Sequence, residues 1–460
     1  MRKKGDDFDR INTTLENQWN KFKRGEVAFI KPDAPQTGKF VVFNNSSRRL
    51  SLLEVFQKMI NNDIVEFMIE CIPRHAWILK HHRPTSHGPA VIKINSRKCW
   101  LILALIIRIT GKQWGPKENK INVNPRREVI QKVAEEFTQE GINQMPGIDI
   151  MERLVTYFLI NQEVMNKIME NLHNFIFALG ECVAGDEKLF HYTANDHLVR
   201  AVQSKPDKVG IWFYELCALL TNGTSILICS SYHNNHNGEM KVFDIVRQWI
   251  NTIMSCGKNR VENGLNPNPN TMLVFDSYYT TRKSVELCEQ FNVIYSASLT
   301  FDRMKDEIKF LKGKNHVDNE RGEWFGMQNI ETNRVIVYCY DTGLKKARYN
   351  VSNGFIRNGS DAEIKKRLNE VPVYDYYKVS FKYCDLFNRS LHHKKWPFRR
   401  GGKNVRGAEG KIHDFFFASV LQNTFNIYRD ILEINEPLDF LLLCDELSLQ
   451  VYNYALTLFE

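Results

Sequence analysis

The sequence predicts an α/β fold in which a mixed sheet flanked by helices is joined to a helical part. Three observations support this fold class. Apolar residues recur at three- and four-residue spacing from 50 to 175, short apolar runs alternate with amphipathic segments from 176 to 300, and two long helical patterns end the chain. With 460 residues, the chain is long enough for two or three domains.

Composition and charge narrow the class of protein. Hydrophobic residues make up 43% and charged residues 25%, which is typical of a globular chain. The formal charge of +9 predicts a polyanionic partner if the basic residues cluster. The ten cysteines form no CxxC pair, so we expect buried, reduced thiols and no structural zinc. The longest apolar run, "CWLILALII", is far shorter than the ~20 residues that span a bilayer, so no membrane partner is expected.

The first part of the chain is predicted to be helical after a polar start. Residues 1–49 are polar and irregular, and we interpret them as an N-terminal arm. Residues 50–175 contain helical patterns such as "LSLLEVFQKMINNDIVEFMIECI", separated by polar breaks. This segment therefore predicts a helical part of its own.

The pattern changes to strands and helices in residues 176–300. A first strand is expected in "FIFALGECVAGDEKLF", ending near Asp186. Two further strands, 208–220 and 224–232, are joined by the hairpin turn "TNG". An amphipathic helix, the buried strand "TMLVF", the helix "RKSVELCEQF" and the strand "NVIYSASL" follow. This order of elements predicts a mixed sheet with helices on its faces.

The last part of the chain interrupts this pattern and then returns to helices. Residues 301–371 are charged and turn-rich, with strand candidates in "RVIVYCYD" and "KARYNVSNGF", and we interpret them as an insertion. Residues 372–392 predict a helix. Residues 393–460 predict a basic loop followed by two C-terminal helices.

Three aspartates stand out by their positions on these elements. Asp186 lies on the first strand of the sheet, Asp276 ends the strand "TMLVF", and Asp385 lies on the helix after the insertion. Phosphodiester chemistry often uses two divalent ions ~3.5–4 Å apart between carboxylates. Carboxylate oxygens suit Mg²⁺ or Mn²⁺. The pattern predicts a two-metal site.

Each aspartate also has a structural interpretation. Asp186 suits a turn, and Asp385 suits a solvated helix surface. Asp276 suits the N-cap of the next helix, but Thr280 and Thr281 stand directly before that helix and are better placed to cap it. Metal binding is therefore the more specific hypothesis for Asp276.

Several motifs around these residues resemble, in order, those of piggyBac-type transposases. "GDEKLF" resembles the first-aspartate motif of that family, and "SKPDKVGIWFYELC" resembles the strand that follows it. "FDSYYTT" and "NVIYSASLTFDR" resemble the second-aspartate motif and its following strand. "PVYDYYKVSFKYCDLFN" resembles the third-aspartate motif, and "KKWPFR" and "LQNTFNIY" resemble a tryptophan segment and an asparagine–tyrosine helix. The resemblance spans roughly residues 50–432, more weakly over 50–175.

The resemblance implies a specific architecture and activity. It implies an RNase H-like catalytic core in 176–300 and 372–392, split by the insertion 301–371, with a helical dimerisation and DNA-binding part formed by 50–175 and 393–460. It places the three catalytic, metal-binding aspartates at Asp186, Asp276 and Asp385. It further implies DNA cleavage and strand transfer at TTAA-type sites, two Mg²⁺ or Mn²⁺ ions, a homodimer, double-stranded DNA as partner and a nuclear location.

The chain also departs from the family pattern, which keeps other functions open. Lys382 and Tyr383 stand where the family has two glycines, Lys378 replaces an asparagine, and Asn388 replaces a second acid. The cysteine-rich zinc domain that usually ends the family is absent from this sequence. One alternative is a domesticated, non-catalytic DNA-binding or chromatin-associated protein, and another is a nuclease that does not join strands.

A basic segment follows the third aspartate. The stretch 391–413 contains aromatic Trp396 and the cations Lys394, Lys395, Arg399, Arg400, Lys403, Arg406 and Lys411, against the single acid Glu409. Basic side chains neutralise phosphates and an aromatic ring stacks on an unpaired base, although a charge run is often only a solvated surface. We expect Lys394, Lys395, Trp396, Arg399, Arg400, Lys403 and Arg406 to contact DNA without reading its sequence.

Overall fold

The computed structural model describes most of the sheet and of the helical part. The described residues are 18–23, 27–29, 40–44, 49–72, 95–111, 125–139, 145–148, 151, 155, 160–192, 198–201, 209–233, 241–256, 271–300, 302–312, 324–341, 346–353, 355–357, 377, 380–392, 407–434, 436 and 439–458. Among these residues, no helix is both long and apolar enough to cross a membrane.

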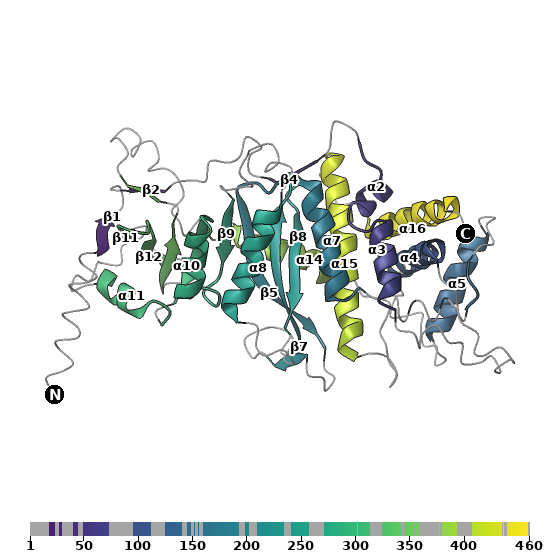
Figure 1. The fold of residues 1–460 in the computed structure, drawn as a ribbon, viewed down its shortest axis with the longest axis horizontal. Helices are drawn as coiled ribbons and strands as arrows, with labels where there is room; N and C mark the ends of the chain where they lie inside the picture. The colour runs from purple at the N-terminus through teal and green to yellow at the C-terminus, as the bar shows by residue number, and fades with distance from the viewer. Residues whose placement is uncertain are drawn as a thin grey trace.

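A ten-stranded mixed sheet forms the framework of the site (Figure 1). Its strands run in the order β1 (Trp19–Lys23), β11 (Trp324–Asn329), β12 (Val335–Asp341), β13 (Lys346–Ser352), β10 (Tyr295–Leu299), β9 (Met272–Phe275), β5 (Cys182–His191), β7 (Val209–Leu219) and β6 (Val199–Ala201), and β8 (Ser225–Tyr232) also pairs with β7. Strands β5, β9 and β10 are parallel, whereas β7 runs antiparallel to both β5 and β8. The carboxyl ends of β5, β9 and β10 therefore lie at one edge.

Helices cover both faces of the central strands. On one face lies α8 (Val242–Ser255), whose Trp249 ring occupies the space next to Gly185, and α10 (Arg282–Gln290) packs beside α8. On the other face α14 (Lys382–His392) packs against β5, β7 and β8. Because side chains alternate along a strand, neighbouring residues of β5 and β7 contact different helices. All four residues of β9 are buried, as expected for a parallel strand covered on both faces.

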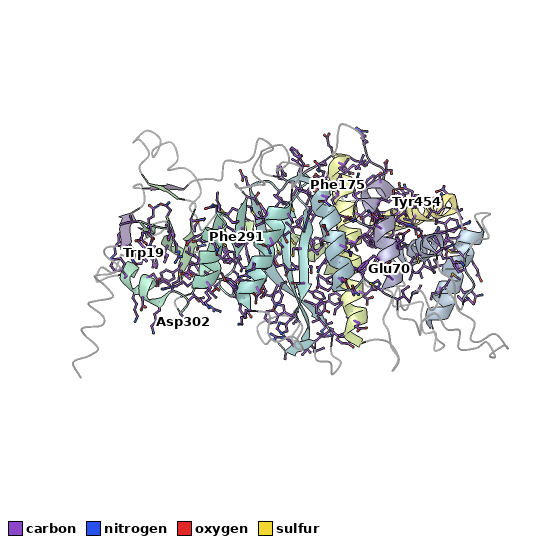
Figure 2. All side chains as sticks on the ribbon, in the orientation of Figure 1. Trp19, Glu70, Phe175, Phe291, Asp302 and Tyr454 are labelled. Atoms are coloured by element: carbon purple, nitrogen blue, oxygen red, sulfur yellow. The ribbon has the colours of Figure 1, made fainter. Side chains whose placement is uncertain are left out.

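The helical part lies at the opposite end of the molecule from β1 and α11 (Lys305–Lys312) (Figure 1). It contains α2 (Leu52–Gln57), α3 (Asn62–Glu70), α4 (Ser96–Gly111), α5 (Pro125–Gln139) and the C-terminal α16 (Phe440–Thr457), which packs against α4. Figure 2 shows Tyr454 and Glu70 at this end and Trp19 at the other. Segments from both ends of the sequence thus build one helical body.

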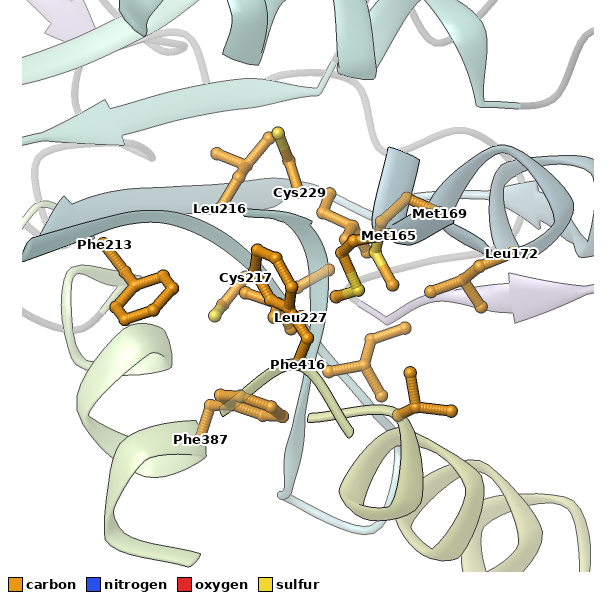
Figure 3. Close-up of a cluster of buried hydrophobic side chains, with 14 of the residues drawn as sticks. Met165, Met169, Leu172, Phe213, Leu216, Cys217, Leu227, Cys229, Phe387 and Phe416 are labelled. Atoms are coloured by element: carbon orange, nitrogen blue, oxygen red, sulfur yellow. The ribbon is translucent and has the colours of Figure 1, made fainter. Parts of the chain in front are cut away.

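Two long helices join the helical part to the sheet. These are α7 (Gln162–Phe175) and α15 (Gly407–Ile431), which lie between the two bodies (Figure 1). Figure 3 shows the apolar core at this junction, to which α7 contributes Met165 and Met169 and the sheet contributes Leu216 and Leu227. The sheet and the helical part therefore share one continuous hydrophobic core.

Helix α15 also covers the free edge of β8. Asn423 accepts from the Leu227 N–H (2.9 Å) and donates to the Leu227 carbonyl (2.7 Å), and Asn426 donates to the Ser225 carbonyl (2.8 Å). These asparagines supply hydrogen bonds that a further strand would make, so α15 covers the edge of β8 at Ser225 and Leu227. The asparagine–tyrosine segment "LQNTFNIY" thus has a structural role.

The predicted strands of the sheet are confirmed, with differences at their ends. The hairpin "TNG" joins β7 to β8, and Gly223 has the positive φ of +77° that its turn requires. The first strand does not end near Asp186 but continues to His191, because β7 pairs with it along its whole length. The predicted helix over 372–392 is confirmed over Lys382–His392, and residues 377 and 380 are helical as well, while the rest of 372–379 lies outside the described residues.

The polar start of the chain contains strands that its sequence did not predict. Strand β1 pairs with β11, β2 (Val27–Phe29) pairs with β14 (Phe355–Arg357), and β3 (Val42–Phe43) pairs with β4 (Ile176–Ala178). The expectation of an irregular segment throughout 1–49 is wrong at these strands, since each is stabilised by a distant partner. Strands β11 to β13 of the segment 301–371 extend the central sheet through β13 and β10.

Candidate functional site

Asp186 and Asp276 follow the same register position on adjacent parallel strands. Gly185 of β5 is the register partner of Phe275 of β9, and the next residue on each chain is an aspartate. Since register partners on neighbouring strands point to the same face, the two carboxylates leave the sheet close together. Both side chains are half-buried. Two buried strands, β5 and β9, therefore position the first two carboxylates of the site.

Backbone donors hold both strand carboxylates. Asp186 Oδ1 accepts from the N–H of Glu187, and Asp276 Oδ1 accepts from the N–H of Tyr278, each at 2.8 Å. The N-cap of α10 is Thr281, whose Oγ1 accepts from the Ser284 N–H (3.1 Å). The predicted capping role of this threonine is confirmed. Asp276 therefore does not act as the N-cap of α10, and its Oδ1 closes a short turn with the Tyr278 N–H.

The raised pKa of the buried Tyr279 indicates that three carboxylates lie close to its hydroxyl. Tyr279 donates from its hydroxyl to Glu187 Oε2 (2.8 Å). Burial first, and then the negative charges of Glu187, Asp186 and Asp276, raise the pKa of Tyr279 well above its ordinary value. The phenol therefore stays protonated and keeps donating to Glu187.

Helix α14 is attached to the same strands by hydrogen bonds from its buried face. Cys384 Sγ donates to the Ala184 carbonyl (3.1 Å), and Asn388 Nδ2 donates to Glu215 Oε2 (2.8 Å). Asp385 lies in the first turn of this helix and is exposed. The structure thus brings the first turn of α14 to the strand that carries Asp186, with Asp385 on the solvent side of the helix.

Two residues that depart from the resembled motif have structural roles on α14. Tyr383 is buried where the resembled family has a glycine, and its carbonyl accepts from Ser225 Oγ (2.8 Å). Asn388 is buried and hydrogen-bonds to Glu215. The Tyr383 side chain therefore adds packing, and the Asn388 side chain adds a hydrogen bond, where α14 meets the sheet.

One solved structure has a similar fold. A piggyBac transposase, determined by cryo-EM in a synaptic complex with hairpin DNA, aligns with 91% of this chain and 84% of its own, with a TM-score of 0.58 and 11% sequence identity. The fold is piggyBac-like. At this identity the likeness concerns the fold alone. No family model and no curated protein matches the sequence.

The piggyBac-like fold also contains a buried carboxylate that the sequence reasoning missed. Glu215 of β7 is the register partner of Asp186 and is 0% exposed. Its ligand atom and the sulfurs of Cys217 and Cys384 all lie within 4.8 Å of one another. Burial raises the pKa of both thiols, so they are protonated. A glutamate inside the apolar run "GIWFYELCALL" was the signal that could have identified it.

The predicted DNA-contacting residues lie outside the described part of the chain. These are Lys394, Lys395, Trp396, Arg399, Arg400, Lys403 and Arg406. The described flanks are the end of α14 and the start of α15, so the segment connects the Asp385 helix to the helix that covers β8. Lys411 of α15 lies with its Nζ 5.7 Å from the centre of the Phe190 ring and 3.9 Å from Asp414 Oδ2.

Proposed function

We propose that this chain is a piggyBac-like transposase core that cleaves and joins DNA strands with two divalent metal ions. The observation that carries the proposal is the pairing of Asp186 and Asp276 at adjacent positions of parallel strands, within a piggyBac-like fold. The order of the central strands, with β8, β7 and β5 antiparallel and β9 and β10 parallel to β5, supports an RNase H-like core.

The donor set fits hard divalent ions. Asp186, Asp276 and Asp385 offer carboxylate oxygens, which Mg²⁺ and Mn²⁺ prefer, and rigid strands position the first two. In the proposal these three residues hold the ions. When bound, two such ions activate the attacking oxygen and stabilise the leaving oxygen of the phosphodiester. The buried cysteines Cys217 and Cys384 suit softer metals and have no part in this step.

The chain's own residues position the carboxylates. The N–H groups of Glu187 and Tyr278 each occupy one oxygen of an aspartate, which limits rotation of Asp186 and Asp276. Glu187 is held by the Tyr279 hydroxyl. Attachment of α14 to Ala184 and Glu215 sets the distance of Asp385 from the strands. Such preorganisation lowers the cost of bringing charged groups together in the transition state.

The substrate in this proposal is double-stranded DNA. The net charge of +9 favours a polyanion, and the basic segment after Asp385 follows directly on the proposed catalytic helix. We further propose action at TTAA-type sites, a homodimer built through the helical part, and a nuclear location.

The test uses purified protein, Mg²⁺ and a supercoiled plasmid that carries TTAA sites. We expect metal-dependent nicking and linearisation, which Asp276→Ala reduces about 1000-fold, as the loss of several kcal/mol of charge stabilisation predicts. Asp63→Ala is the matched control, because Asp63 is an exposed aspartate in the first turn of α3. Binding of Mn²⁺, measured by calorimetry, should weaken in Asp276→Ala and not in Asp63→Ala.

Other results would contradict the proposal. Equal cleavage by Asp276→Ala and the native chain would show that the Asp276 carboxylate takes no part in the reaction. Salt-dependent DNA binding without cleavage, unchanged when Asp186, Asp276 and Asp385 are all replaced by alanine, would identify a non-catalytic DNA-binding protein. Cleavage without joined products from an oligonucleotide with a free 3′-OH would identify a nuclease.

A further inference from the structure

Two adjacent tyrosines after β9 differ sharply in burial. Tyr279 is 0% exposed, donates to Glu187 and lies with its ring 4.7 Å from that of Trp249. Tyr278 is 38% exposed and is not among the residues of the hydrophobic core. Tyr279 therefore anchors the turn, whereas the Tyr278 ring lies at the surface beside Asp276.

The Tyr278 ring is nevertheless held in one orientation. Its backbone N–H donates to Asp276 Oδ1 at 2.8 Å. Its ring stacks on Trp212 with centroids 5.9 Å apart and an interplanar angle of 29°, and it meets Tyr279 edge-on at 5.1 Å. An exposed aromatic ring that is already ordered loses little conformational entropy when a flat ligand stacks on it.

Two arginines flank this aromatic pair. The Arg200 guanidinium lies 5.9 Å from the centre of the Trp212 ring. Arg303 is exposed, and its Nη2 donates to the Tyr278 carbonyl at 3.4 Å. Aromatic rings that stack on bases, combined with cations that neutralise the backbone, are the features by which proteins bind single-stranded nucleic acid.

We propose that Tyr278, supported by Trp212, is a stacking site for one unpaired nucleobase of the strand held at the aspartates. The inference rests on the proposed function and adds a substrate contact to it. The stacking site is two residues from Asp276, so a base next to the phosphate at the carboxylates can reach it. A base stacked there keeps that strand unpaired at the point of reaction.

The test measures binding of a DNA duplex that ends in one unpaired 2-aminopurine, with Ca²⁺ in place of Mg²⁺. We expect the fluorescence of this base to be quenched on binding, and Tyr278→Ala to weaken the complex about 10-fold, which is the loss of one base–aromatic stack. A fully paired duplex should bind equally to both proteins. Tyr278→Phe should retain quenching, whereas Tyr278→Leu should lose it.

The matched control is Phe291→Ala. The exposed fraction of Phe291, 39%, is similar to the 38% of Tyr278. Phe291 ends α10 and precedes β10, so it lies at the amino ends of β9 and β10, whereas Asp276 follows the carboxyl end of β9. Unchanged affinity and unchanged quenching in Tyr278→Ala, with its melting temperature intact, would overturn the inference. Cleavage by Asp276→Ala would overturn the proposed function alone, because the fluorescence assay needs no cleavage.

Discussion

The strand aspartates and the helix aspartate of the proposed site are held in different ways. Asp186 lies within the strand β5 and Asp276 directly follows the strand β9, both are half-buried, and both accept hydrogen bonds from backbone N–H groups. Asp385 is exposed, and its helix is attached through side chains, Cys384 to Ala184 and Asn388 to Glu215. The backbone therefore determines the position of the first two carboxylates, while packing and a few polar side chains determine the third.

This difference means that the site can lose its third carboxylate without losing its sheet. Strand pairing on both sides of β5 involves many hydrogen bonds, so no single side chain controls Asp186. By contrast, α14 depends on the buried contact with Glu215. Changes at that contact should affect the helix first, and changes beside Gly185 should affect the strands.

The largest effect is expected at the attachment of α14. Glu215→Ala removes the acceptor of the buried Asn388 amide and leaves a cavity next to Asp186, so we expect a loss of about 3 kcal/mol in the free energy of unfolding. Urea unfolding measures this loss, and hydrogen exchange should show α14 less protected than β5.

Two variants control for that result. Glu170→Ala changes an exposed glutamate on α7 and should cost little. The double variant Glu215→Leu with Asn388→Leu should recover part of the stability, because neither polar partner is left buried alone. Equal losses in Glu215→Ala and Glu170→Ala would show that the contact does not hold the helix.

A smaller effect is expected on the strand side. A Cβ added at Gly185 would lie 2.5 Å from Cζ3 of the buried Trp249, so Gly185→Ala forces the indole or β5 to shift. Overpacking of this kind costs about 2 kcal/mol, measured by thermal or urea unfolding. Gly147→Ala is the control, since an added Cβ there meets nothing within 4 Å. The prediction is wrong if Gly185→Ala and Gly147→Ala unfold at the same temperature and the same urea concentration.

Alkaline pH should give the smallest effect. Burial raises the pKa of the Cys229 thiol from 9.0 to about 11. Between these values the unfolded chain binds fewer protons than the folded chain, so stability is complete below pH 9 and falls as the pH rises. This one thiol should account for about 1 kcal/mol by pH 10. The test compares the free energy of unfolding of Cys229→Ala and of the native chain at pH 8 and at pH 10. The loss between the two pH values should be about 1 kcal/mol smaller in Cys229→Ala.

The control for the pH series is Cys71→Ala. Cys71 is only partly buried, so its removal should change the pH dependence less than removal of Cys229. Burial raises the pKa of Cys217 and Cys384 as well, and these thiols lie between β7 and α14. Protection of α14 against hydrogen exchange should therefore also fall with rising pH, and it should fall more than the protection of β5.

Local patterns in the sequence were sufficient to predict most of the strands of the sheet. The run "TMLVF" followed by Asp276, the turn "TNG" and the cap at Thr281 depend on residues close together in the chain, and all three lie where the pattern predicts. The short strands β1 to β3 could not be predicted in this way. Their residues are polar or few, and their partners lie far along the chain.

The sequence by itself determined which strands are apolar enough to be buried and where a carboxylate follows them, because these properties depend on local composition. Only the tertiary structure decided that Asp186 stands in register beside Asp276 and Glu215, and that Asn388 docks α14 against this glutamate. Register and helix docking depend on side chains that are distant in sequence, and their energies arise only when the sheet and its helices pack together.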